Sequence, residues 1–225
     1  WLLHNAVRIA AREDRSAFFN VPLCTMFAVS GDRAGADALL VGRNLDWAEP
    51  ELPVVIESRP EDGHAYLQAG FTWNAGVFTG MNDAGLVLCA ERAEHLGRPE
   101  PKGAPVEFLL RELLEDAGTV EDAVARLKTA THLRGYHVLA AAPADEGPEA
   151  VVLEFGDTVG ERAPADGLLP GTGLDNYQVR EETCARYTQV MEALGDERII
   201  GADEIESVLG TAAPGREGLG SVWNP

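Results

Sequence analysis

The sequence predicts an α+β domain in which antiparallel sheets are stacked and helices cover them from outside. Two observations favour this class. The first half of the chain holds at least five short apolar segments separated by turns, with no helix between them. Helical segments, then more strands, then more helices follow, as in a layered α+β domain rather than in alternating βαβ units. At 225 residues, the chain is one domain or at most two small ones.

The first elements are a helix and a hairpin. Residues 2–12 carry apolar side chains on one broad side, which predicts a helix. Residues 22–30 and 38–41 predict two strands, and the glycine-containing segment 31–37 is the turn between them. These two strands would form a buried hairpin.

Two further strand pairs are expected next. The first pair surrounds a turn at 60–63, and the second surrounds a turn at 81–84 in which Asn82 has a structural role. The four strands are expected at 53–57, 65–68, 76–79 and 85–90.

The second half mixes helices and strands. Apolar residues at helical spacing predict helices at 105–116 and 120–129, the latter with Thr119 as its N-cap. Strands at 136–142 and 150–155 follow, and then a loop over 156–173 that is rich in Gly, Pro and Asp. The last helices are expected at 181–194, ended by Gly195, and at 202–209.

Charge and composition exclude several classes of protein. The chain has 18 basic and 37 acidic residues and a net charge of −19, so it repels phosphate backbones and anionic membranes. We therefore expect no nucleic-acid partner, and no apolar run is long enough for an integral membrane segment. The three cysteines form no CxxC pair and the histidines no HExxH, so we expect neither a metal nor another cofactor.

The chain begins at Trp1 rather than Met, which predicts a fragment or a processed form. No signal peptide is visible. The cellular location stays open, with the cytoplasm slightly favoured.

One cysteine has neighbours suited to chemistry. Cys24 stands at the head of the apolar run CTMFAV, and the next apolar run ends in Arg43 and Asp46. A thiol becomes a good nucleophile when a nearby cation and an orienting carboxylate favour the thiolate. The alternatives are a buried core thiol and a structural Arg43–Asp46 ion pair.

These segments carry a family resemblance. CTMFAV, GRNLDW and FTGMNDAGLVLCAER resemble the N-terminal-nucleophile amidases of the penicillin acyltransferase and acid ceramidase type. The resemblance implies a four-layer αββα sandwich and a precursor that cuts itself just before its nucleophilic cysteine. It divides the chain into residues 1–23, the end of the pro-region, and residues 24–225, the catalytic domain.

The resemblance also implies roles for single residues. Cys24 matches the nucleophile, and cleavage of the Leu23–Cys24 bond would free the α-amine that acts as its base. Arg43 matches the arginine beside the thiol and Asp46 the aspartate that contacts the new amine. Glu91 matches a glutamate that ends the corresponding strand, with a solvated strand end as the alternative.

Two more residues come from the second half of the chain. Asn176 resembles an oxyanion-hole asparagine, a role that its amide donor suits chemically, and the alternative is a turn residue. Arg186 resembles an arginine on the following helix. Leu23 departs from the pattern, because the family has a small residue before the nucleophile.

The resulting hypothesis is a self-processing cysteine amidohydrolase or acyltransferase. It would act on a small soluble amide through a thioester on Cys24, and its two fragments would remain together as a heterodimer. One alternative is a Cys–His hydrolase that uses Cys24 or Cys89 with His137 and does not cleave itself. Another is a non-catalytic member of the fold that serves as a binding or scaffold domain.

Overall fold

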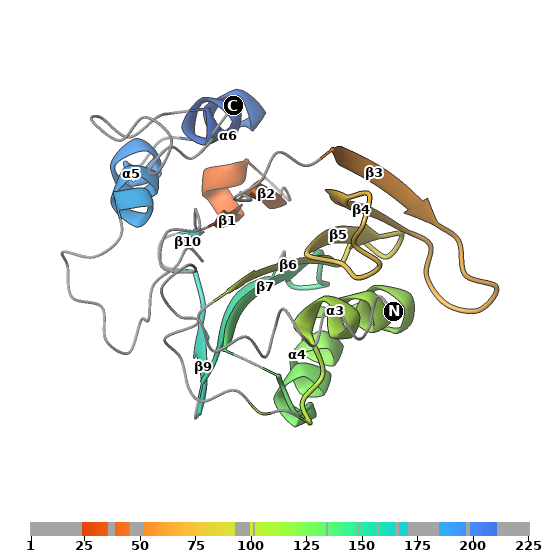
Figure 1. Ribbon diagram of the computed structural model, residues 1–225. Coiled ribbons are helices and arrows are strands. Elements are labelled where there is room, and N and C mark those ends of the chain that lie inside the picture. Colours follow the sequence, from red (N-terminus) through yellow and green to blue (C-terminus); the bar gives the residue numbers. More distant parts are fainter. Residues whose placement is uncertain are drawn as a thin grey trace.

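Two antiparallel sheets form the centre of the protein (Figure 1). The computed structural model describes residues 24–35, 39–45, 52–92, 100, 102–133, 135–147, 149–156, 158–164, 167–170, 185–196 and 199–210. Within these residues, seven strands form the larger sheet in the order β3-β4-β5-β6-β7-β8-β9, and three form the smaller sheet in the order β10-β1-β2.

The larger sheet is a meander in which each strand pairs with the next one along the chain. Its strands are β3 (Pro53–Ser58), β4 (Tyr66–Phe71), β5 (Thr79–Asn82), β6 (Val87–Arg92), β7 (Tyr136–Ala142), β8 (Glu149–Phe155) and β9 (Val159–Arg162). Two helices, α3 (Val106–Asp116) and α4 (Val120–Thr129), connect β6 to β7.

The smaller sheet begins with the predicted hairpin. Strand β1 (Thr25–Ser30) pairs with β2 (Leu39–Asn44) and, on its other side, with β10 (Leu168–Pro170). A short 3-10 helix, η1 (Gly31–Ala34), lies between β1 and β2. After β10, the chain continues to α5 (Ala185–Leu194) and α6 (Ala202–Leu209).

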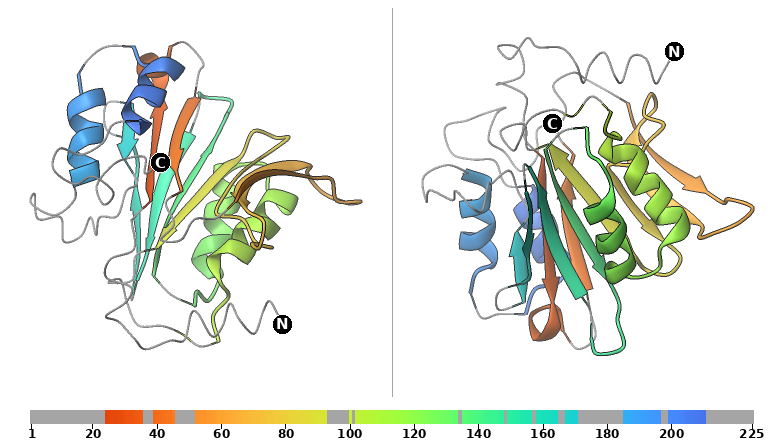
Figure 2. Two further views of the ribbon diagram at one scale, coloured as in Figure 1. Left: turned by 45° about the horizontal axis from the view of Figure 1, so that its top comes forward. Right: turned by 90° about the horizontal axis from the view of Figure 1, so that it is seen from below.

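The layers follow from three apolar clusters. One joins the larger sheet to α3 and α4, a second joins β1 and β10 to α5 and α6, and a third lies between the two sheets. The two helix pairs therefore cover opposite outer faces, as the left view of Figure 2 shows. The fold is α+β with four layers in the order αββα, as predicted.

Strand β1 shows how the sequence produces these layers. Every residue from Thr25 to Ser30 is buried. Because side chains alternate along a strand, Met26 and Ala28 face the larger sheet, whereas Phe27 and Val29 face the outer helices. A strand that is buried on both faces needs apolar residues at nearly every position, as this one has.

Two expectations about the strands were wrong. The strand expected at 76–79 begins only at Thr79 and runs to Asn82. Val77 and Phe78 are instead buried in the connection, where Val77 N donates to Glu107 O at 2.8 Å and Phe78 O accepts from Ala90 N at 2.8 Å. Val77 and Phe78 are apolar because they are buried under α3, and they are not part of a strand.

The region 156–173 was expected to be loop, but it holds two short strands. β9 pairs with β8, and β10 pairs with β1. Their register partners and Arg162, which donates to Pro170 O at 2.6 Å, stabilise these segments despite their Gly and Pro content. The pairing of these strands with β8 and β1 cannot be predicted from the composition of the segment itself.

Other elements agree with prediction. The helices α3, α4 and α6 and the strand β7 lie where periodicity placed them, and Thr119 Oγ1 caps α4 by accepting from Asp122 N at 3.1 Å. Asn82 is structural: its amide donates to Leu114 O at 3.1 Å and Ala117 O at 2.7 Å. The helix expected at 2–12 lies outside the described residues.

Candidate active site

Three of the predicted site residues come together between the two sheets. Cys24 directly precedes β1, Arg43 lies on β2, and Glu91 lies near the end of β6. Arg43 pairs in register with Met26, so it shares the inner face with Met26 and Cys24. From there its guanidinium faces Cys24, Cys89 and Glu91.

Arg43 is held by contacts from the opposite sheet. Its Nε donates to Thr79 Oγ1 at 3.2 Å and its Nη2 donates to Ala90 O at 2.7 Å. The guanidinium also faces Cys24 closely enough for the two groups to interact electrostatically. These contacts fix a cation beside the half-buried thiol, the arrangement that favours a thiolate.

The pKa of Arg43 reflects this environment. Burial acts to lower the pKa, but the interactions of the guanidinium with the charged forms of Cys24, Cys89 and Glu91 raise it above its ordinary value. Arg43 is therefore a permanent cation at this position.

The second cysteine of the site is of a different kind. Cys89 is fully buried on the inner face of β6, and burial raises the pKa of its thiol to about 11, although Arg43 acts in the opposite direction. A thiol with this pKa is protonated at neutral pH and unreactive. Of these two cysteines, Cys24 is thus the one whose position suits nucleophilic chemistry.

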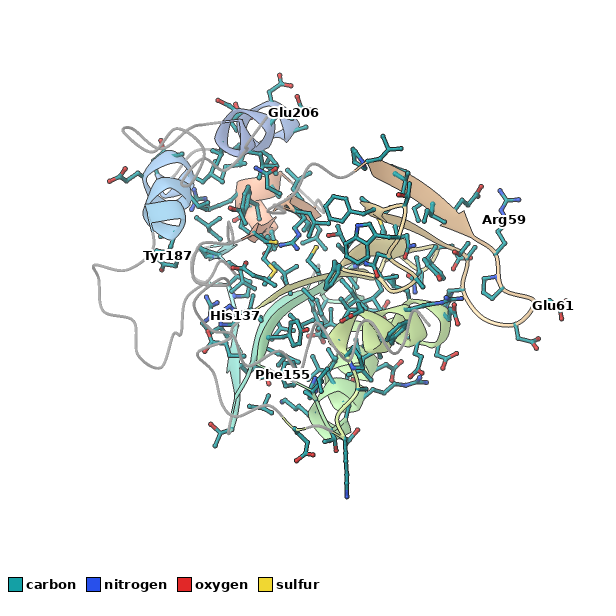
Figure 3. The ribbon with its side chains drawn as sticks, in the orientation of Figure 1. Arg59, Glu61, His137, Phe155, Tyr187 and Glu206 are labelled. Carbon is teal, nitrogen blue, oxygen red and sulfur yellow. The ribbon has the colours of Figure 1, made fainter. Side chains whose placement is uncertain are left out.

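Glu91 is not a solvated strand end. Only 2% of the residue is exposed, and it lies directly opposite His137 of β7, which is fully buried. His137 is thus near the site, and the Cys–His alternative remains a prediction. Figure 3 shows His137 on the side of the sheet toward β1, whereas Phe155 lies on the side of α4.

A cavity of about 790 Å³ extends from Arg43 along the open side of the sandwich. Arg43, Thr79 and Cys89 form one end, and the rest of the described lining is mostly apolar. Much of that lining comes from β2, β4 and β5 and from the β7–β8 turn: Leu39, Val41, Leu67, Ala69, Met81, Pro143 and Ala144. In Figure 2, left, β3–β5 diverge from the smaller sheet on this side.

Three apolar side chains of the cavity lining are exposed to solvent. Val55, Leu67 and Met81 are 73%, 46% and 47% exposed, and all three line the cavity. Their register on β3, β4 and β5 places them on one face. An apolar hollow of this size with few polar groups at one end has the features of a small-molecule site.

Several predicted residues lie outside the described part of the chain. These are Leu23, Asp46 and Asn176, and with them the Leu23–Cys24 bond. Arg186 belongs to α5, but its side chain is not described. Their roles therefore stay predictions.

The sequence reasoning missed Glu154 and Arg162. Glu154 is 2% exposed on β8, opposite His137, and its Oε1 lies 3.3 Å from Arg162 Nε. A single acidic residue inside the apolar strand AVVLEF was the available signal, because a charge in a buried strand needs a partner.

No group of three His, Cys, Asp or Glu side chains in the described ranges is arranged to hold a metal ion. In those ranges no helix is long and apolar enough to cross a bilayer.

Solved structures support the fold. An N-acylethanolamine-hydrolyzing acid amidase ortholog from Caenorhabditis elegans is similar, with a TM-score of 0.65, 19% identity, and coverage of 87% of this chain and 88% of that one. A mutant conjugated bile acid hydrolase from Clostridium perfringens has a TM-score of 0.52 and 15% identity, with coverage of 84% and 68%. At these identities, the likeness concerns the fold. No curated protein sequence matches the chain.

A family model matches more directly. The model of the acyl-coenzyme A:6-aminopenicillanic acid acyl-transferase family matches residues 33–159, which is more than half of the chain. The match includes Arg43, Asp46 and Glu91 and begins after Cys24. Together with the αββα sandwich, this match identifies the chain as a member of the acyl-coenzyme A:6-aminopenicillanic acid acyl-transferase family, with the N-terminal-nucleophile hydrolase fold.

Proposed function

We propose that this protein is a self-processing cysteine amidohydrolase or acyltransferase that acts through a thioester on Cys24. The observation that carries the proposal is the position of Arg43. Its guanidinium faces Cys24, whose charged form acts on the pKa of Arg43, and it also lines the large apolar cavity. A reactive thiol and a place for an acyl group would then adjoin the same cation.

The first step would be cleavage of the Leu23–Cys24 bond, which separates residues 1–23 from the catalytic domain 24–225. The new α-amine has an ordinary pKa near 8, so it can act as a base at neutral pH. It would take the thiol proton, and the thiolate would attack the amide carbonyl. The two fragments would stay together as a heterodimer.

The remaining residues have roles that follow from the family resemblance. Asp46 would hold the amine and Arg43 would favour the thiolate. Asn176 would donate to the oxyanion of the tetrahedral intermediate, and loss of one such donor costs roughly 10²–10³ in rate. The amine then leaves with a proton, and water or an acceptor amine attacks the thioester to regenerate the thiol.

The cavity favours an apolar acyl group. Its described lining is mostly aliphatic, and Val55, Leu67 and Met81 would be covered by a bound chain. Burial of each CH₂ group contributes about 0.8 kcal/mol. This refines the expected small soluble amide to one whose acyl part is apolar. The structural neighbours, an N-acylethanolamine-hydrolyzing amidase and a conjugated bile acid hydrolase, support an amide substrate by analogy.

A series of N-acyl amides with acyl chains of two to about twelve carbons tests the proposal. We expect release of the free acid, with kcat/KM rising along the series, and a fall in kcat of about a thousandfold or more in Cys24→Ala. Thr129→Ala, at the end of α4 and outside the described cavity lining, is the control and should keep the wild-type rate. Turnover that survives in Cys24→Ala would contradict the proposal.

A further inference from the structure

Arg43 reaches across the space between the two sheets, and two hydrogen bonds hold its side chain on the larger one. Its backbone belongs to β2. Its guanidinium donates from Nε to Thr79 Oγ1 of β5 at 3.2 Å and from Nη2 to Ala90 O of β6 at 2.7 Å. A free arginine side chain populates many rotamers. The orientation of this cation therefore depends on the acceptors that β5 and β6 supply.

The two acceptors are neighbours in the larger sheet. Thr79 lies directly opposite Cys89, the residue before Ala90, and Ala90 N donates to Phe78 O at 2.8 Å. Because backbone hydrogen bonds join the two segments, the spacing between the acceptors is fixed. Nε and Nη2 lie on the same edge of the planar guanidinium, so two acceptors at a fixed spacing define its plane as well as its position.

Only one of these acceptors depends on the identity of a side chain. Ala90 O is a backbone carbonyl that any residue would supply. Thr79 supplies a hydroxyl oxygen, and a β-branched side chain is restricted in χ1, so the oxygen is held in a set direction. Thr79 and Arg43 both line the cavity, so this contact lies within the candidate site.

The orientation of Arg43 matters to the thiol. Its guanidinium faces Cys24, Cys89 and Glu91 closely enough for electrostatic interaction. By linkage, an interaction between the cation and the charged form of Cys24 favours both charged groups equally. Its strength falls as the distance between the charges grows. Without the contact to Thr79, a single hydrogen bond would leave the guanidinium free to turn, and the thiolate would be less favoured.

We propose that Thr79 is a positioning residue for the reaction, because its hydroxyl oxygen fixes the plane of the Arg43 guanidinium beside Cys24. Thr79 acts through Arg43, and no contact with the reacting atoms is assigned to it. The inference rests on the proposed function, since it concerns the thiol that serves as the nucleophile there.

The rate of Cys24 alkylation by iodoacetamide, followed by peptide mass spectrometry from pH 5 to 10, tests the proposal without any substrate. Thr79→Val removes the acceptor at nearly the same volume and changes no charge among the groups that face Arg43. We expect the midpoint of the alkylation profile to rise by about 0.5 pH unit, which makes alkylation about threefold slower below the midpoint. The rate at high pH should not change.

The conservative variant and a second removal of the hydroxyl complete the series. Thr79→Ser keeps the acceptor, so its midpoint should lie within about 0.2 pH unit of the wild type. Thr79→Ala lacks the hydroxyl and should show the same rise as Thr79→Val, which gives a result even if valine does not fit. A folded Thr79→Val or Thr79→Ala protein with the wild-type midpoint would overturn the inference.

A double-mutant cycle shows whether Thr79 acts through Arg43. In Arg43→Met, no guanidinium remains to be oriented, so adding Thr79→Val should move the midpoint by less than about 0.2 pH unit. An equal rise in both backgrounds would mean that the hydroxyl acts on Cys24 by another route, and this would refute the proposal.

Thr129→Val is the matched control. The Thr129 hydroxyl donates to Ala125 O at 3.2 Å and to Arg126 O at 3.0 Å. These groups lie at the end of α4, on the outer side of the larger sheet, so the midpoint should stay at the wild-type value. Absence of amide turnover in the wild type would refute only the proposed function, since alkylation of Cys24 requires no substrate.

Discussion

The side chain of Arg43 contacts several groups at once. It contacts Thr79 through Nε, Ala90 O through Nη2, and Cys24 as well. A lysine has the same charge, but its donors all lie on one nitrogen, so they do not match partners that are spaced around a planar guanidinium. The reactivity of Cys24 should therefore depend on the planar arrangement of the guanidinium donors as well as on the positive charge.

Arg43→Lys should slow alkylation of Cys24 at pH 7.5 by about tenfold, because a displaced cation raises the pKa of a thiol by about one unit. The rate is measured with iodoacetamide and peptide mass spectrometry. Arg111→Lys is the matched control on the surface of α3, where Arg111 pairs with Glu115 at 3.1 Å. Equal alkylation rates in wild type and Arg43→Lys would be evidence against this role.

Cys89 should make stability depend on alkaline pH. Its thiol has an ordinary value of 9.0, and burial raises its pKa to about 11 in the folded protein. Between these values, the unfolded chain releases the proton and the folded chain keeps it. The stabilisation is therefore complete below pH 9 and is lost as the pH rises through 11.

Urea unfolding at several values between pH 8 and 11 measures this effect. The free energy of unfolding of the wild type should fall by up to about 1.4 kcal/mol per pH unit more steeply than that of Cys89→Ala. The difference between the two proteins removes the contribution of all other titrating groups. Parallel curves would show that Cys89 is not protonated as described.

At the scale of elements, the end of α3 is tied to the β5–β6 turn by one residue. Asn82 donates to two carbonyls near the end of α3, at Leu114 and Ala117, and its Oδ1 accepts from Leu86 N at 2.9 Å. Asn82 is 3% exposed, so water does not replace these bonds if the amide is removed.

Asn82→Ala should lower the free energy of unfolding by about 2–4 kcal/mol, since it leaves buried backbone groups without partners. Denaturant unfolding measures the change. Asn74→Ala is the control: Asn74 Oδ1 accepts a single bond from Gly76 N in a loop, so the loss should be below about 1 kcal/mol. Similar losses for both variants would contradict the role assigned to Asn82.

Periodicity predicted most of these elements and failed where pairing is long-range. α3, α4 and β7 have strong local signals, so their predicted positions were correct to within a residue. β9 and β10 are short and rich in Gly and Pro, and they form only because β8 and β1 offer partners. The register of those pairs is a property of the whole fold.

The same limit applies to the site. The pair Cys24 and Arg43 could be predicted, because two adjacent strands of a hairpin bring their ends together. Glu91 was predicted as a site residue from the family resemblance, and its burial opposite His137 could not be predicted from the sequence. Glu154 had a signal in the sequence, but its pairing with Arg162 depends on the strand order β7-β8-β9 and could not be predicted from it.

At the scale of the whole molecule, the space between the two sheets has a closely packed part and an open part. Where they pack closely, they bring together Cys24, Arg43 and the buried carboxylate of Glu91. On the side of β3–β5 they leave the apolar cavity. The closed part suits a reaction that needs fixed charges, and the open part suits a ligand that must enter and leave.

Self-cleavage before Cys24 is the central claim, and intact mass with N-terminal sequencing tests it most directly. We predict that the purified wild-type protein separates under denaturing conditions into a fragment ending at Leu23 and a chain beginning at Cys24, and that Cys24→Ala remains one chain. A wild-type protein that hydrolyses amides while Leu23 and Cys24 remain joined would contradict the account.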